Sequence, residues 1–416
     1  MKNCNEVKVL LTRRGFLCAV AASMVAVAGC AVCCVAANSL PPGNWHEPVR
    51  AGLQKVIDRH AGDPDAYAVF DFDNTCALGD CEHAVLGYIV DNLAFAFSPD
   101  ELPGVFLEGM PDQDRPLEPG RERATARNLV ADCVDLYREL REMKSRLPIE
   151  DVRRTDAFAA FAAKTRFLRK RISRTFGTGF GYQWSKRFYS GMTPAQFRDT
   201  MYAALDAAAA DGRFRRCVWK TPAARAGRSG CVEVSMFLGF SVPQEIKDLV
   251  RVLKENGIAV YVVSGSFQDA VLAASDGRYG VAFPAENVFG IHMKHDAKGR
   301  LAGWADDRFP LPWAEGKPDV IRRQIAVRHH GKAPILVAGD ANGDYAMLTA
   351  FDDMEVGLVF DTRPEEDSPL GRLIADVRSG KGDGRYFVQG RDETIPGLRK
   401  SSETILVPQT ILGCQP

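Results

Sequence analysis

The feature of this sequence that most constrains its fold is a series of short apolar runs that alternate with helix-like segments in the second half of the chain. Residues 258–263 (IAVYVV) and 335–339 (ILVAG) are typical of fully buried strands, and helices are expected to begin at Pro243 and Pro318. A similar apolar run, 67–72 (YAVFDF), stands far upstream. Strands separated by helices predict a parallel sheet, and ligands of such sheets bind beyond the carboxyl ends of the strands. We therefore predict an α/β fold with its functional site at those ends.

The long stretch after the first of these strands has a different pattern. Residues 81–240 are mostly helical in pattern, with long charged segments and no alternation of strands and helices. One segment, 164–175 (KTRFLRKRISRT), is typical of a solvated helix face, with attraction of phosphate as the alternative. Because 416 residues are long for one compact core, we expect two domains. The predicted divisions are a signal segment (1–37), the start of the core (38–80), a helical insert (81–240), the remainder of the core (241–400) and a C-terminal tail (401–416).

The N-terminal segment has the pattern of an export signal. Residues 12–17 (TRRGFL) resemble a twin-arginine signal and lead into an uncharged apolar run, 16–37. Within that run, 27–30 (VAGC) resembles a lipoprotein box, whereas 35–37 (VAA) suits an ordinary signal peptidase. We favour cleavage before Cys30, and therefore expect a periplasmic or outer-surface protein held at a membrane by lipid on Cys30. A membrane-spanning anchor is the alternative, since the run is just long enough to cross a bilayer.

Charge and cysteine content exclude some classes of protein. The 53 basic and 53 acidic residues cancel, so we expect no nucleic acid as partner. The cysteines after residue 37 show no C-x-x-C spacing and lack the set of nearby histidines that a zinc site usually brings, so no structural zinc is expected. Cys217 and Cys231 flank a turn-rich segment between two strand-like segments. A disulfide-closed hairpin and two buried free thiols are both compatible with this pattern.

The residues with catalytic potential begin at the end of the first predicted strand. The segment 71–75 (DFDNT) places two carboxylates two residues apart on a loop that leaves the sheet. A carboxylate can attack phosphorus to form an aspartyl-phosphate, and this step needs a second carboxyl group to protonate the leaving alkoxide and later to deprotonate water. We predict that Asp71 is the nucleophile and that Asp73 is the general acid and base.

Two carboxylates that face a phosphate dianion would repel it unless a divalent cation lay between them. Further carboxylates follow the strand at 335–339, in the segment 339–344 (GDANGD). Hard oxygen ligands with room for water suit Mg²⁺. We predict that Asp71, Asp340 and the backbone carbonyl of Asp73 bind Mg²⁺, with Asp344 as a further ligand or an outer-shell partner.

Two other segments supply groups for the phosphate. Residues 264–266 (SGS) follow a predicted strand, where a hydroxyl, backbone amides and the N-terminus of the next helix can bind phosphate oxygens. Lys317, at the start of another helix, offers a positive charge that stabilises the phosphoryl group during transfer. Each motif alone is weak, but four in this order form a specific set. The predicted phosphate ligands are Thr75, Ser264, Gly265 and Lys317.

This set of motifs resembles that of the haloacid dehalogenase superfamily, over about residues 65–80 and 240–400. The resemblance implies a Rossmann-like core with helices on both faces of its sheet. It also implies that the insert is similar to the helical cap of the phosphoserine phosphatase branch, although the insert here is larger than that branch needs. Dehalogenases lack the second aspartate, so the presence of Asp73 favours hydrolysis of a phosphate monoester.

A closer likeness concerns the phosphorylcholine phosphatase group. It rests on Asn74, on 190–194 (SGMTP) in the insert and on 385–392 (RYFVQGRD) near the end of the chain. The likeness implies a small amine- or choline-bearing phosphate ester as substrate. A broad-specificity exported phosphatase and a catalytically inactive binding lipoprotein on the same fold are the alternatives.

The same likeness implies acidic residues shortly after the nucleophile loop. Asp80 and Glu82 occupy that stretch, but His83 stands where a further acid is expected. Aromatic residues of the insert, Trp184 among them, are candidates for cation–π contact with a quaternary ammonium, with core packing as the alternative. The predicted specificity residues are Asp80, Glu82 and Trp184.

Overall fold

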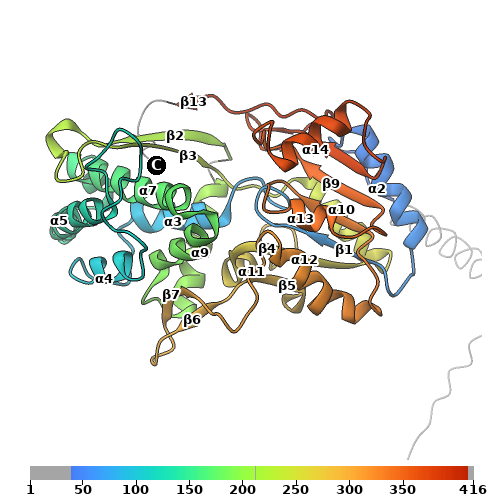
Figure 1. Cartoon of the computed structure of the whole chain (residues 1–416), viewed down its shortest axis with the longest axis horizontal. Helices are drawn as coiled ribbons and strands as arrows, with labels where there is room; N and C mark the ends of the chain where they lie inside the picture. The colour runs from blue at the N-terminus through green and yellow to red at the C-terminus, as the bar shows by residue number, and fades with distance from the viewer. Residues whose placement is uncertain (1–38, 211, 411–416) are drawn as a thin grey trace, which may run out of the picture.

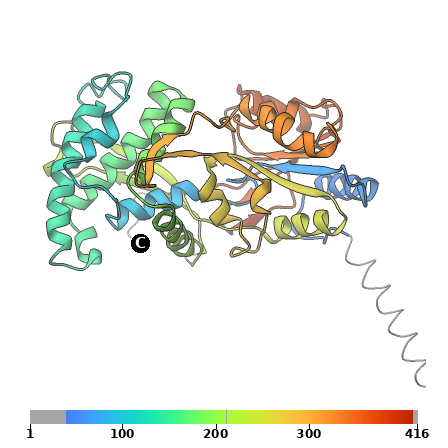
Figure 2. The same cartoon turned by 90° about the horizontal axis from the view of Figure 1, so that it is seen from below.

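The structure, a computed structural model, describes residues 39–210 and 212–410. Two lobes lie side by side along the long axis of the molecule, an α/β core and a mainly helical cap (Figure 1), and both are also visible from below (Figure 2). The predicted export signal, lipoprotein box and spanning anchor concern residues outside the described part. Within that part, no helix combines the length and the apolar character needed to cross a bilayer.

The core is built on a six-stranded parallel sheet of order β10-β9-β8-β1-β4-β5. Its strands are β1 (Tyr67–Phe70), β4 (Ala259–Phe267), β5 (Val288–Ile291), β8 (Leu336–Gly339), β9 (Val356–Phe360) and β10 (Tyr386–Gln389). Strand β1 lies between β4 and β8, so that Ala68 is opposite both Val260 and Leu336. The loops that carry the predicted motifs therefore leave neighbouring strands at the same edge of the sheet.

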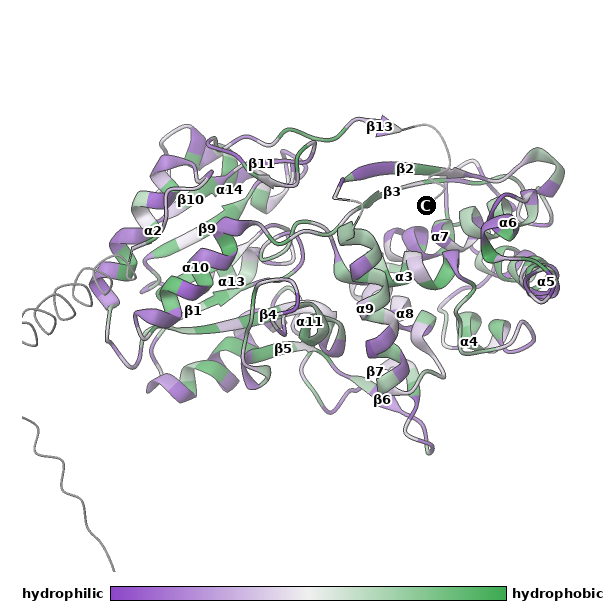
Figure 3. Ribbon diagram, turned by 180° about the vertical axis from the view of Figure 1, so that it is seen from behind, coloured by the Kyte–Doolittle hydropathy of each residue, from purple (hydrophilic) through white to green (hydrophobic). Residues whose placement is uncertain are grey.

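Helices cover both faces of this sheet. Alternate residues of β1 belong to two separate apolar clusters, with Ala68 and Phe70 in one and Tyr67 and Val69 in the other. The first face carries α2 (Glu47–His60), α10 (Gln244–Glu255) and α11 (Gln268–Ala274), and the second carries α12 (Gly316–Val320), α13 (Tyr345–Thr349) and α14 (Pro369–Arg378). Helix α10 is strongly two-sided, with apolar residues toward the sheet and charged residues outward (Figure 3). The predicted α/β fold with helices on both faces is confirmed.

The cap is formed mainly by the residues between β1 and α10. Its helices are α3 (Cys81–Asp91), α4 (Leu102–Leu107), α5 (Ala126–Lys144), α6 (Ile149–Arg153), α7 (Asp156–Phe176), α8 (Thr178–Ser185), the 3-10 turn η1 (Lys186–Tyr189) and α9 (Pro194–Ala210). Helix α7 contains the basic stretch that we expected to be solvated, but Lys164 and Arg166 are fully buried. Lys164 donates to Asp132 at 2.6 Å and Arg166 to Asp91 at 2.7 Å, so these cations bind acids of α5 and α3 instead of facing water.

A two-stranded hairpin completes the cap and excludes both alternatives for Cys217 and Cys231. Strands β2 (Arg215–Lys220) and β3 (Glu233–Leu238) are antiparallel, with Cys217 opposite Met236. Cys217 is disulfide-bonded, but Cys231 is a free and exposed thiol. A 217–231 bridge is therefore wrong, because this register separates the two residues by roughly 16 Å along the strand direction. The alternative of two buried free thiols is wrong as well, since Cys217 is bonded and Cys231 is exposed.

Two later segments return from the core to the cap. The hairpin β6 (Met293–His295) and β7 (Leu301–Ala305) contacts the segment 190–194, where the N–H of Gly191 donates to Leu301 and the N–H of Leu301 donates to Met192, both at 2.8 Å. Beyond the short pair β11 (Arg391–Asp392) and β12 (Gly397–Leu398), strand β13 (Gln409–Thr410) pairs in parallel with β2. The cap is thus tied to the core by chain segments from both ends of the insert and from the C-terminal part.

Candidate active site

The loop after β1 is shaped by its own backbone hydrogen bonds. The N–H of Asp71 extends the ladder to Ala338 of β8 at 2.9 Å, and the N–H groups of Cys76 and Ala77 both bond to the carbonyl of Phe72, at 2.8 and 3.0 Å. Asn74 lies in the left-handed region, with φ of 61°, which asparagine tolerates better than most residues. This tight turn directs the side chains of Asp71 and Asp73 into one pocket.

That pocket has a volume of about 80 Å³ and lies at the carboxyl ends of the central strands. Its lining comes from every predicted motif and from the cap: Asp71, Asp73, Asn74, Asp80, Tyr182, Ser264, Gly265, Ser266, Trp313, Lys317, Asp340, Ala341, Gly343 and Asp344. Tertiary structure therefore brings together segments that lie far apart in the sequence.

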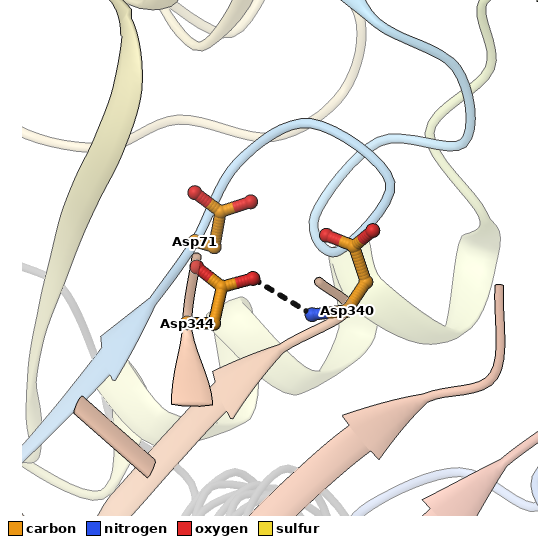
Figure 4. A group of neighbouring side chains, drawn as sticks. All are labelled: Asp71, Asp340 and Asp344. Atoms are coloured by element: carbon orange, nitrogen blue, oxygen red, sulfur yellow. Dashed lines mark hydrogen bonds between the residues drawn. The ribbon is translucent and has the colours of Figure 1, made fainter. Parts of the chain in front are cut away.

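Three buried aspartates form the acidic side of the pocket. Asp71, Asp340 and Asp344 each offer a carboxylate oxygen within 4.8 Å of the others (Figure 4). Asp344 is heavily engaged, because one oxygen accepts the N–H groups of Asp340 and Ala341 at 3.0 Å and the other accepts Nζ of Lys317 at 2.6 Å. Lys317 also donates to Asp71 at 2.6 Å. Asp71 and Asp340 are thus the two acids with oxygens to spare.

Burial sets the protonation of these groups. It raises the pKa of Asp71 to about 7, with Asp344 adding to the rise and Lys317 opposing it. Burial and the neighbouring Asp344 also raise the pKa of Asp340 well above its usual value. Although burial alone would lower the pKa of Lys317, Asp344 and Asp71 raise it. One ammonium cannot neutralise three carboxylates, so the donor set fits a divalent metal cation.

Asp73 lies in a different environment from Asp71. One oxygen accepts the backbone N–H of Cys81 at 2.8 Å, and the other accepts the hydroxyl of Ser266 at 2.6 Å. Burial, with Asp80 next in size, raises the pKa of Asp73 well above its usual value. Asp73 is therefore suited to carry a proton at a fixed position.

Two predicted phosphate ligands differ from expectation. Ser264 lies within β4, which continues through a bulge to Phe267, and α11 begins only at Gln268, so the N-terminus of that helix does not follow Ser264 directly. Thr75 is fully buried and donates to Asp340 at 3.1 Å instead of lining the pocket. Ser264, Gly265 and Lys317 do line it.

The three predicted specificity residues have different locations. Asp80 lines the pocket and also caps α3 by accepting the N–H of His83 at 2.8 Å. Glu82 is buried against Lys186, and it accepts the hydroxyl of Tyr189 at 3.0 Å. Trp184 is fully buried, and its Nε1 donates to the carbonyl of Phe106 at 3.0 Å. Glu82 and Trp184 therefore belong to the packing of the cap and do not line the pocket.

Two other aromatic residues line the pocket in place of Trp184. Tyr182 of α8 and Trp313 of the loop before α12 have ring centroids 6.1 Å apart. Both flank Gly265, because a Cβ built there would lie 3.6 Å from Trp313 and 3.8 Å from Tyr182. The sequence carried one signal for Trp313, its place four residues before Lys317, and none that separated Tyr182 from the other aromatics of the insert.

Comparison with protein families identifies the class of protein. Residues 153–349 match the haloacid dehalogenase-like hydrolases. This match includes Ser264, Lys317 and Asp340 and begins downstream of Asp71. Together with the fold, it confirms the resemblance found in the sequence: a stretch just short of half the chain matches the haloacid dehalogenase-like hydrolases, and the chain is an enzyme of the hydrolase class.

Individual proteins extend the comparison. The chain is similar to phosphorylcholine phosphatase of Pseudomonas aeruginosa, with 25% identity over 320 residues, which are 71% of this chain and 74% of that protein. It is also similar to the crystal structure of a conserved, functionally unknown protein from Anaerococcus prevotii DSM 20548. The second similarity has a TM-score of 0.78 and 26% identity and covers 89% of this chain and 100% of that one.

Proposed function

We propose that this hydrolase is a Mg²⁺-dependent phosphomonoesterase in which Asp71 attacks the phosphate. The observation that carries the proposal is the pocket itself, where the carboxylate of Asp71 meets Lys317 at 2.6 Å and lies beside Asp340 and Asp344. A carboxylate nucleophile, a fixed cation and a set of hard oxygen donors are the groups that phosphoryl transfer requires.

The two carboxyl groups of the loop divide the reaction between them. An oxygen of Asp71 forms a bond to phosphorus while the bond from phosphorus to the alcohol oxygen breaks, and Asp73 gives its proton to that leaving oxygen. Asp73, now a carboxylate, then takes a proton from water, whose oxygen displaces Asp71 and releases inorganic phosphate. The bonds from Ser266 and Cys81 hold Asp73 in place for both proton transfers.

The metal is assigned to Asp71, Asp340 and the backbone carbonyl of Asp73. Asp344 supports the site from outside, because its oxygens already accept two backbone N–H groups and Lys317. When bound, Mg²⁺ supplies positive charge that offsets the repulsion between the carboxylates and the substrate phosphate. Lys317, the hydroxyl of Ser264 and the backbone at Gly265 bind the remaining phosphate oxygens.

The rest of the pocket favours a substrate with a cationic group. Apart from the motif residues, its side-chain lining includes Asp80, Tyr182 and Trp313, and Lys317 is the one basic residue among the lining residues. An acid beside two aromatic faces suits an amine or a quaternary ammonium. The similarity to a phosphorylcholine phosphatase supports the same class of substrate, a small amine- or choline-bearing phosphate ester.

A neutral isostere tests this proposal. Phosphate release from phosphocholine is compared with release from 3,3-dimethylbutyl phosphate, which has the same shape with carbon in place of nitrogen. We expect kcat/KM to be about ten-fold higher for phosphocholine, and Trp313→Leu to remove most of that advantage. Equal values for both esters in the unaltered enzyme would favour a broad-specificity phosphatase. Absence of phosphate release from every ester with Mg²⁺ present would leave an inactive binding protein.

We also propose that the protein is exported and lipid-anchored at Cys30. The support is the twin-arginine-like segment 12–17 and the lipoprotein-like box 27–30. Cys30→Ser should move the protein from the membrane fraction to the soluble fraction, with Cys33→Ser as the matched control. Unchanged membrane attachment of the Cys30 variant would contradict the lipid anchor and favour a spanning segment.

A further inference from the structure

The C-terminal motif 385–392 has no role in the reaction outlined above, yet its arginine reaches the catalytic loop. Arg391 is 4% exposed, and its Nη1 donates to Oδ1 of Asn74 at 3.0 Å. Asn74 stands between the acid Asp73 and Thr75, which binds Asp340. One hydrogen bond therefore joins a segment near the end of the chain to the centre of the nucleophile loop.

The other contacts of Arg391 hold it in place. Its Nη2 donates to Glu393 at 2.9 Å, and Glu393 is 1% exposed. Glu393 in turn accepts Arg216 of the cap strand β2 at 2.9 Å. The guanidinium of Arg391 also lies over the ring of Phe237 in β3, 5.7 Å from its centroid. Arg391 is thus fixed between the cap hairpin and the catalytic loop.

The conformation of Asn74 explains why such a contact matters. A φ of 61° is uncommon outside glycine, and although asparagine tolerates it better than most residues, the conformation is held only where its surroundings favour it. A charge-assisted hydrogen bond to the side chain of Asn74 stabilises that conformation. Because Asp73 and Thr75 adjoin this residue, a change in its backbone would displace both of their side chains.

We propose that Arg391 is a positioning residue of the catalytic loop, which holds Asn74 in the left-handed conformation and thereby sets the positions of Asp73 and Thr75. This inference rests on the proposed phosphatase activity. It goes beyond that activity by giving Arg391, which does not line the pocket, an effect on turnover.

A double-mutant cycle with Asn74→Gly and Arg391→Met tests the proposal. Glycine adopts the left-handed conformation freely but lacks the amide that Arg391 binds, so Asn74→Gly removes the contact without adding strain. Turnover of phosphocholine, an alkyl phosphate whose leaving oxygen needs the proton of Asp73, is measured as phosphate release with saturating Mg²⁺. We expect each single change to lower kcat about ten-fold, with KM within about two-fold, as expected for loss of a charge-assisted hydrogen bond.

The double variant gives the decisive comparison. Its kcat should equal that of the less active of the two single variants, since both changes remove the same contact. A kcat reduced by the product of the two single losses would overturn the proposal and leave Arg391 a stabilising role only. Arg399→Met is the matched control, because Arg399 bonds to Glu403 within the same segment, and it should leave kcat unchanged.

A second variant covers the case in which Arg391→Met does not fold. Arg391→Lys keeps a charge opposite Glu393 but loses the two-nitrogen fork that spans Glu393 and Asn74. Any loss of kcat in Arg391→Lys should disappear in the Asn74→Gly background, and a loss of equal size in both backgrounds would overturn the proposal. Full activity of both Arg391→Lys and Asn74→Gly would overturn it as well. An unaltered enzyme without phosphatase activity would instead contradict the proposed function.

Discussion

At the residue scale, the pocket gives different environments to carboxylates of the same kind. Asp344 has both oxygens occupied by N–H groups, whereas Asp71 is held by Lys317 on one oxygen. Asp73 has a hydroxyl, a backbone N–H and the thiol of Cys81 as partners, and within the described part of the chain no cationic side chain bonds to it. These differences, and not the residue type, separate a nucleophile, a proton carrier and a supporting residue.

Asp71→Asn should abolish turnover while the protein remains folded. The amide is nearly isosteric with the carboxylate but cannot form the aspartyl-phosphate, so we expect kcat to fall by about 10³-fold or more. Phosphate release and a thermal unfolding curve measure the two parts of this prediction. Asp367→Asn, a change at an exposed acid, is the control. Activity near that of the unaltered enzyme would rule out Asp71 as the nucleophile.

The loss of kcat caused by Asp73→Asn should depend on the leaving group of the substrate. We expect kcat for phosphocholine to fall by about 10²-fold or more, and kcat for p-nitrophenyl phosphate to fall much less, because a phenolate leaves with little help from an acid. Ser266→Ala should show the same preference with a smaller loss, since it removes one of the bonds that hold Asp73. Equal losses with both esters would remove the acid role from Asp73.

At the element scale, the first turn of α3 joins the catalytic acid to the cap. Asp80 caps the helix, the N–H of Cys81 binds Asp73, and Glu82 is buried against Lys186 of η1. A displacement of this turn would therefore move Asp73. The pairing with Lys186 also means that Glu82 already has a cationic partner, which makes it a connection between cap elements and not a site for the substrate's ammonium.

Lys186→Met should destabilise the protein strongly. It leaves Glu82 buried without its cation, so we expect a loss of about 3–5 kcal/mol in the free energy of unfolding. Tyr189→Phe, which removes only a hydroxyl partner of the same carboxylate, should cost about 1 kcal/mol. Chemical denaturation measures both variants. A Lys186→Met variant as stable as the parent would show that the buried pair contributes nothing.

At the scale of the whole molecule, the acidic pocket links metal binding to stability. Asp71 has a pKa of about 7 in the folded protein, raised from 3.8 by burial. Burial makes Asp71 hold its proton more tightly in the folded protein than in the unfolded chain. Its contribution to the free energy of unfolding is therefore complete below the unfolded pKa of Asp71 and is lost as pH rises through about 7. Asp340 is shifted in the same direction.

Removal of metal should therefore reduce the thermal stability more at alkaline pH than at acidic pH. We expect Mg²⁺ to raise Tm at about pH 8.5, where the carboxylates must ionise, and to raise it much less at about pH 5.5. In the presence of a chelator, the Tm of Asp71→Asn should depend less on pH than the Tm of the unaltered protein, because the amide does not titrate. Differential scanning calorimetry with and without a chelator measures both effects. Equal Mg²⁺ effects at the two pH values would contradict the acidic site.

Local patterns in the sequence determined the core of this protein and the segments that form its pocket. The residues of β1 are all fully buried, and an uninterrupted apolar run is what such a strand requires. The same parallel arrangement brings the loops that follow β1, β4 and β8 to one edge of the sheet, so their polar residues were expected to meet. The order of the segments along the chain was sufficient to predict this meeting, because each strand and the loop that follows it are contiguous in sequence.

Only the tertiary structure decided which side chains of the cap reach the pocket and which are buried within it. Trp184 and Tyr182 lie two residues apart on α8, yet the first packs in the interior and the second lines the pocket. Lys164 and Arg166 have the composition of a solvated face but bind acids of α5 and α3. These outcomes depend on which helix packs against which, and that packing is set by contacts between residues far apart in the sequence, which local patterns do not encode.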